Sequence, residues 1–157
     1  MRLVGRMALV ALVIGTSLTV SATERIDLWL VLSTSSSWVF VPVLQLLTGL
    51  ILVRGVSGKG PALAAYFGTH VPWSLWIIAV HALLFVVGPA RDEALWLAVT
   101  AVIPAVLTVR LLLALCEREW GIPRDVARRR VAAHQALSYL LVLVYASLAV
   151  ALWPRLA

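Results

Sequence analysis

The sequence predicts an all-α integral membrane protein, a bundle of five transmembrane helices with a cytoplasmic N-terminus and a C-terminus outside. Three observations lead to this prediction. The 157 residues are 62% hydrophobic and only 13% charged, which is too apolar for a soluble domain of this size. Five apolar segments each approach or exceed the length of about 20 residues that a helix needs to cross hydrocarbon. The basic residues also fall mainly in alternate loops.

The five predicted spans account for most of the chain, so we expect one transmembrane helical domain over residues 1–157. The spans cover residues 7–23, 28–53, 71–88, 94–115 and 131–153.

The first predicted span has a second interpretation. Arg2 and Arg6, followed by an apolar run and small residues, also fit a signal peptide over residues 1–22. Its cleavage would leave four spans in the same orientation. We favour a retained helix, in which Gly15-x-x-x-Thr19 provides a face of small residues for close packing.

Prolines and glycines predict where the other spans bend, begin or end. Pro42 removes a helical hydrogen bond and predicts a kink in the second span. After that span, residues Pro61–Phe67 are expected to form a short interfacial turn. Gly88 and Pro89 are expected to end the third span, and Asp92 is the candidate N-cap of the fourth. The last helix is expected to run from about residue 123, so that its first two turns form a basic cytoplasmic extension.

Basic residues distinguish the two sides of the predicted bundle. The side of the N-terminus holds Arg2, Arg6, Arg54, Lys59, Arg110, Arg118, Arg124, Arg128, Arg129 and Arg130. The opposite side holds Arg25, Arg91 and Arg155. The positive-inside rule therefore places the N-terminus in the cytoplasm, and it accounts for the net charge of +6 without nucleic-acid binding. The basic loop over residues 116–130 is expected to face anionic lipid headgroups, with docking of an acidic subunit as the alternative.

Polar side chains inside the spans are the candidates for function, because each is costly in lipid unless it finds a partner. We use the name polar seam for five of them: Thr34, Ser37, Gln45, Thr48 and His81. The first four follow one stripe of the second span. We interpret the seam as a hydrogen-bonded contact between helices, with a solvated path or a ligand contact as the alternative. Ser37 can also donate to the carbonyl of Ser33, one turn back.

Two of the three histidines are expected at a similar depth. His70 and His134 both lie near the cytoplasmic ends of helices that start on that side, so they could ligate a b-type haem. Packing or interfacial roles are the alternative. His81 lies too deep to pair with His134. The single cysteine, Cys116, excludes an internal disulfide and a cysteine metal cluster, and we predict no metal site.

Two stretches resemble a known family. The helix "WVFVPVLQLLTGLILVRG" and the C-terminal "RRRVAAHQALSYLLVLVYASLAVALWPRLA" are similar to the copper-resistance-D-like superfamily of small helical bacterial integral membrane proteins. The resemblance implies the bacterial cytoplasmic membrane as the location. Haem-associated relatives of that group carry a histidine early in the first helix, whereas none precedes His70 here. No haem ligand is therefore carried over from the resemblance.

We predict a non-enzymatic protein, because the few carboxylates lie at membrane boundaries and none lies inside a span. Our leading hypothesis is an accessory or structural subunit, whose partners are the lipid bilayer and other membrane protein subunits. The alternative is a b-type haem protein that transfers electrons. A third hypothesis is a small-solute or ion permease that uses Gln45 and the hydroxyl stripe.

Overall fold

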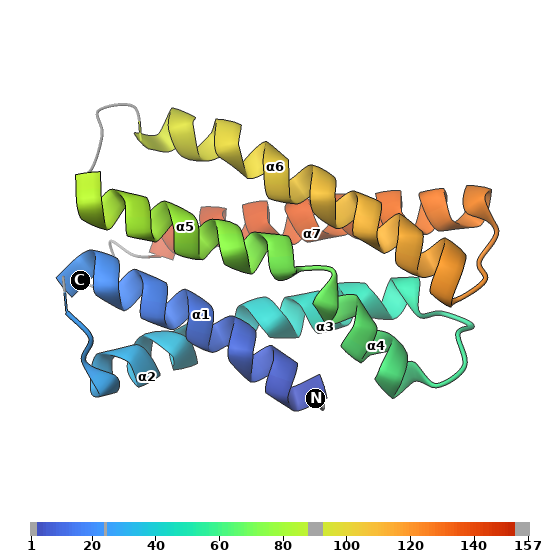
Figure 1. Cartoon of the computed structure of the whole chain (residues 1–157), viewed down its shortest axis with the longest axis horizontal. Coiled ribbons are helices and arrows are strands. Elements are labelled where there is room, and N and C mark those ends of the chain that lie inside the picture. The colour runs from blue at the N-terminus through green and yellow to red at the C-terminus, as the bar shows by residue number, and fades with distance from the viewer. Residues whose placement is uncertain (1–2, 24, 88–92, 153–157) are drawn as a thin grey trace.

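The structure, a computed structural model, describes residues 3–23, 25–87 and 93–152, and within these ranges it contains helices and loops but no strand. The helices are α1 (Leu3–Thr23), α2 (Leu28–Ser37), α3 (Phe40–Leu52), α4 (Lys59–Gly68), α5 (Val71–Val87), α6 (Glu93–Ala114), the π-helical segment Leu115–Glu119, and α7 (Arg124–Leu152). They form an elongated bundle (Figure 1). The all-α prediction is confirmed.

By length and composition, four helical stretches of the described chain suffice to cross a membrane: Leu3–Val20, Leu28–Leu52, Lys59–Val87 and Leu95–Glu119. These are the first four predicted spans, with the third extended to include α4. The structure is therefore compatible with a multi-pass membrane protein. The fifth span, over α7, and the direction of the termini stay predictions.

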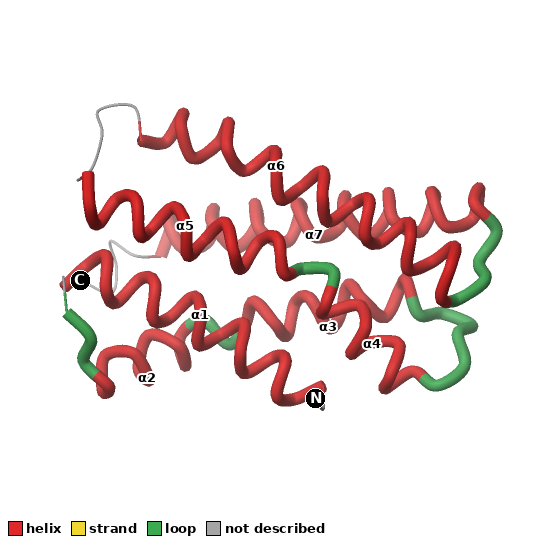
Figure 2. The backbone as a smooth tube through the Cα atoms, viewed as in Figure 1, coloured by secondary structure: helices red, strands yellow, loops and turns green. Residues whose placement is uncertain are grey.

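Three of the loops lie at two opposite ends of the bundle. The loops over residues 53–58 and 120–123 lie together at one end, and the loop over residues 25–27 lies at the other (Figure 2). Between them, α1 packs against α2 and α5, α3 packs against α7, and α6 packs against α5 and α7. The end with loops 53–58 and 120–123 also carries most of the predicted cytoplasmic arginines.

The second predicted span is two helices rather than one. The chain turns at Trp38 and Val39, between α2 and α3. Pro42 lies in the first turn of α3. The backbone N–H groups of a first turn have no acceptor within the helix, so the missing N–H of proline costs no helical hydrogen bond here. The amide of Val43 still donates to the carbonyl of Val39 at 3.3 Å. The predicted kink is thus present, but as a break upstream of the proline.

The predicted turn over Pro61–Phe67 is wrong, because these residues lie inside a ten-residue helix, α4. Gly58 precedes the helix with a φ of 69°, a left-handed conformation that favours glycine. The buried side chains of α4 recur at helical spacing: Ala62, Leu63, Tyr66 and Phe67. The guanidinium of Arg6 on α1 donates to the Ala64 carbonyl and holds α4 against the bundle. Residues Gly88, Pro89 and Asp92, for which a helix end and an N-cap were predicted, lie outside the described residues.

The last helix begins at Arg124, directly after Pro123, close to its predicted start. One arginine in its second turn, Arg130, has a structural role that the charge pattern does not reveal. The Nη1 atom of Arg130 donates to the carbonyls of Leu52 at 3.1 Å and Arg54 at 2.6 Å. These carbonyls lie at the C-terminal end of α3, where a helix leaves its acceptors unsatisfied and favours a positive charge. Arg130 therefore joins α7 to α3.

We expect Arg130→Gln to lower the free energy of unfolding by about 1–2 kcal/mol, because two hydrogen bonds from a charged donor are lost. The free energy is measured by reversible unfolding in mixed micelles. The matched control is Arg128→Gln, since Arg128 lies on the same helix and is exposed. If the two variants are equally stable, Arg130 does not stabilise the contact between α7 and α3.

Candidate functional site

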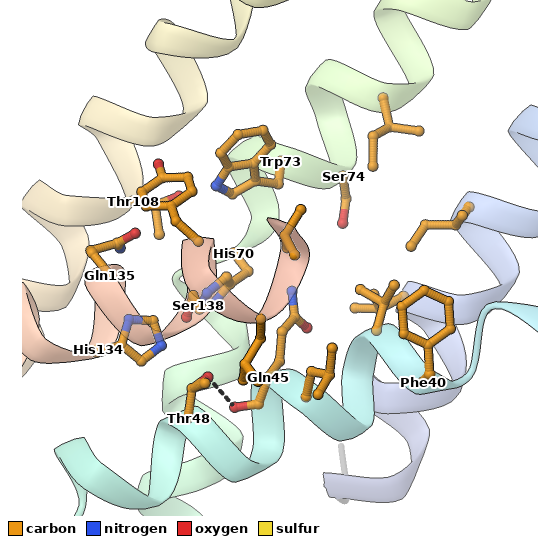
Figure 3. Close-up of a pocket in the computed structure, with 18 residues that line it drawn as sticks. Phe40, Gln45, Thr48, His70, Trp73, Ser74, Thr108, His134, Gln135 and Ser138 are labelled. Atoms are coloured by element: carbon orange, nitrogen blue, oxygen red, sulfur yellow. Dashed lines mark hydrogen bonds between the residues drawn. The ribbon is translucent and has the colours of Figure 1, made fainter. Parts of the chain in front are cut away.

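A cavity of about 300 Å³ lies inside the bundle. It is lined by side chains from α1, α3, α5, α6 and α7 and by His70, and Figure 3 shows it in close-up. The labelled lining residues are Phe40, Gln45, Thr48, His70, Trp73, Ser74, Thr108, His134, Gln135 and Ser138. Among the described residues that line it, none is charged. This volume lies at the lower end of the range of about 300–1,000 Å³ that small-molecule sites occupy.

Three aromatic rings pack together at one end of the cavity. The Tyr66 hydroxyl lies 2.8 Å from Nε2 of His134 in a hydrogen bond. The Tyr66 ring lies 4.7 Å from His70 and 5.4 Å from His134, and the two imidazole rings are 6.0 Å apart, measured between centroids. Tyr66 is 0% exposed and His134 is 1% exposed. The structure thus brings His70 and His134 together through a tyrosine that the sequence did not single out.

Neighbouring hydroxyls hold the three rings in place. Thr48 Oγ1 lies 3.4 Å from the Tyr66 hydroxyl and donates to the carbonyl of Gln45 at 3.2 Å. Nδ1 of His70 lies 3.3 Å from Thr69 Oγ1 and 3.3 Å from the Tyr66 carbonyl. These contacts fix the positions of both imidazoles, because one nitrogen of each ring is hydrogen-bonded: Nδ1 of His70 and Nε2 of His134.

Three buried polar atoms of cavity-lining residues have no hydrogen-bond partner among the described residues. They are Oε1 of Gln45, Oγ1 of Thr108 and Nδ1 of His134. Buried polar groups are nearly always paired, and an unpaired one costs free energy comparable to a lost hydrogen bond. Each of the three atoms has less than 1 Å² of accessible surface, so they are buried beside the cavity and do not open into it.

The polar seam does not continue as one line. The break between α2 and α3 turns its outer half toward α1, where Thr34 Oγ1 lies 3.3 Å from Thr19 Oγ1. Ser37 is exposed, and it donates to the Ser33 carbonyl at 3.1 Å as expected. The inner half, Gln45 and Thr48, reaches the cavity.

His81 lies apart from the cavity. Its Nδ1 is 2.8 Å from the carbonyl of Ile77, and its side chain lines a separate open groove between α1 and α5. Of the three histidines, only His70 and His134 therefore meet.

The cavity does not fit a haem. A bis-histidine haem needs one free nitrogen from each ring pointing at a common iron. Nε2 of His134 is instead bonded to Tyr66, whose ring packs against both imidazoles. A macrocycle placed between His70 and His134 would overlap with that ring. Within the described residues there is also no group of three or more metal-ligating side chains.

Two residues of the site were missed at the level of sequence. Tyr66 was assigned to a turn, whereas it lies in the last turn of α4, and His70, in the turn directly after the helix, packs against its ring. Thr108 is 1% exposed and lies one turn beyond Pro104 inside α6. A lone hydroxyl in an apolar helix is a weak signal by itself, so only the packed structure identifies it.

Comparisons with known proteins do not extend these observations. No family model matches the chain, and no curated protein or solved structure matches it. The resemblance to the copper-resistance-D-like superfamily therefore stays a prediction.

Proposed function

We propose that this chain is a multi-pass membrane protein that binds one small, neutral, lipid-soluble molecule in the cavity between its helices. The observation that carries the proposal is the cavity of about 300 Å³ itself, whose lining is mainly apolar with a few polar side chains, among them Gln45, Ser74 and Ser138. Small-molecule sites have this composition, because an apolar lining buries the ligand and a few polar groups orient it.

The composition of the lining supports binding of a neutral molecule. Because the described lining residues carry no formal charge, a charged ligand would be desolvated without a counter-charge. We propose no chemical step, since the lining residues include no carboxylate and no lysine. That the protein is non-enzymatic stays a prediction from the sequence.

We place the protein in the bacterial cytoplasmic membrane with its N-terminus in the cytoplasm and α7 as a fifth span. Positive charge at the end with loops 53–58 and 120–123 supports this orientation. The polar end of the cavity, at Thr48 and His134, then lies in the cytoplasmic half of the membrane.

A role as accessory subunit is compatible with ligand binding, since a bound molecule can be passed to or shared with a partner. Permeation through a continuous polar path has less support. The seam is interrupted at Trp38 and Val39, and only Gln45 and Thr48 of its five residues line the cavity.

The proposal is tested by native mass spectrometry of the protein purified from its source membrane. We expect the wild type to release a molecule of defined mass, and Ser74→Phe, which fills the cavity, to reduce the bound fraction at least about tenfold. The matched control, Ser147→Phe, alters an exposed position on α7 and retains the ligand. A wild type that carries no ligand, or equal occupancy in both variants, contradicts the proposal. A haem would be detected at its own mass and would contradict the assignment of a smaller ligand.

A further inference from the structure

We propose that the open groove between α1 and α5 is an interface between two copies of this chain, in which Thr16 of one copy donates a hydrogen bond to His81 of the other. The groove has a volume of about 620 Å³, and the two helices that form it lie side by side in the bundle (Figure 1). It is separate from the cavity, so this interface does not depend on ligand binding.

The groove has the shape that a third helix needs. The α1 side chains that line it are spaced by three residues and by one in turn: Leu9, Leu12, Val13, Thr16, Ser17 and Val20. On α5 the same spacing runs over Ile78, His81, Ala82, Phe85 and Val86. This spacing keeps each row on one face of its helix, and the α1 row extends over about 16 Å, or about three turns. A helix from another molecule can pack its side chains between two such rows.

The walls of the groove are not covered by the rest of the described chain. Leu9 is 52% exposed, Ile78 is 46% exposed and Phe85 is 52% exposed. The small side chains of Ser17 and Ala82 lie between the large ones and allow a neighbouring helix to approach closely. Lipid chains also cover apolar groups, so the apolar surface alone does not identify the occupant.

His81 favours a protein occupant over lipid. Its Nδ1 lies 2.8 Å from the Ile77 carbonyl, and because a carbonyl only accepts, the proton of the neutral ring is on Nδ1. Nε2 is then an acceptor, and among the described residues none donates to it. An acyl chain has no donor and hydrocarbon holds no water, so another protein must supply the N–H or O–H. Ionisable side chains within a membrane almost always face the interior of a bundle, and a second molecule on this groove puts His81 there.

A second copy of the chain supplies the required donor. Thr16 lines the same groove, and within the part of the chain that the structure describes its hydroxyl has no hydrogen-bond partner. Copies of one chain insert into the membrane in the same orientation, so a two-fold axis that relates them runs along the membrane normal and keeps every residue at its depth. Thr16 and His81 lie near the middles of the two rows, at similar depth. The α1 helix of each copy then packs in the groove of the other, and the Thr16–His81 hydrogen bond forms twice.

The test measures dimerisation of the full chain in lipid vesicles. Each copy carries one fluorophore, and photobleaching steps count the copies per vesicle over a range of protein-to-lipid ratios. We expect the wild type to dimerise, and Ala82→Phe, which fills the groove, to weaken the dimer at least about tenfold. The matched control, Ala98→Phe, alters an exposed position on α6 and keeps the wild-type affinity. A wild type that stays monomeric, or equal affinities of the two variants, overturns the interface.

Thr16→Val and His81→Leu test the hydrogen bond itself. Because the interface is two-fold symmetric, either substitution removes both bonds, and we expect each to lower the dimer affinity about tenfold. The double variant should be no weaker than either single variant, because the two groups bond to each other. Losses that multiply in the double variant, or single variants with the wild-type affinity, overturn the pairing of Thr16 with His81.

A photo-crosslinking amino acid at position 82 identifies the occupant in the source membrane. We expect a product of twice the mass of the chain. A product that contains a different protein overturns the second copy as occupant, and so does a chain that forms no protein crosslink because only lipid covers the groove.

Discussion

Replacing Tyr66 with alanine is expected to lower the free energy of unfolding by about 3–5 kcal/mol, the range for deleting a large buried aromatic side chain. Tyr66 is 0% exposed and contacts Phe67, His70 and His134. Its ring also fills the space above Gly49, where an added Cβ would lie 2.7 Å from the ring. The void left by its removal adjoins the existing cavity, and Nε2 of His134 loses its partner.

Reversible unfolding in mixed micelles measures this loss, with Leu140→Ala on the exposed face of α7 as the control. Tyr66→Phe separates the two contributions. It keeps the ring and removes the hydroxyl, so the loss should be about 1–3 kcal/mol, the penalty of one buried unpaired group. If Tyr66→Ala is no less stable than Leu140→Ala, Tyr66 does not anchor the rings at the end of the cavity.

The helical class and the positions of the apolar helices were predictable from sequence, because hydropathy and length are properties of each segment alone. The division of the second span into α2 and α3 was less predictable from sequence. Pro42 indicated a kink, but the chain breaks at Trp38 and Val39, upstream of the proline. The position of a break depends on which neighbours accept the freed backbone groups, and that is set by packing. The helix α4 was missed because glycines and Pro61 outweighed the spacing of its buried side chains.

The candidate site was also only partly predictable from the sequence. The nearness of His70 and His134 followed from depth, since both lie near the same end of helices that run in the same direction. Their connection through Tyr66 could not follow, because it requires α4 to be a helix with the right rotation. The sequence could not predict that Oε1 of Gln45 and Oγ1 of Thr108 lack a hydrogen-bond partner. Whether a buried polar atom finds a partner depends on all the segments packed around it.

Replacing Gly15 with alanine is expected to force α1 and α2 apart and to lower the free energy of unfolding by about 1–3 kcal/mol, as overpacking does. A Cβ at Gly15 would lie 2.6 Å from the backbone N and Cα of Ser35 and would also overlap with its hydroxyl. Backbone atoms cannot move aside as a flexible side chain can. The helices touch here because Gly15 and Thr19 form a face of small residues, as expected for close packing of apolar helices.

The matched control is Gly60→Ala in the first turn of α4, where a Cβ meets nothing within 4 Å. Alanine in a helix is favoured over glycine by about 0.5–1 kcal/mol, so this control should be neutral or slightly more stable. The comparison also tests whether the first helix is retained or cleaved as a signal peptide. If residues 1–22 were removed as a signal peptide, the mature protein would lack position 15, and Gly15→Ala would unfold with the wild-type free energy. A loss of stability confined to Gly15→Ala would mean that α1 is retained and that its contact with Ser35 holds it in the bundle.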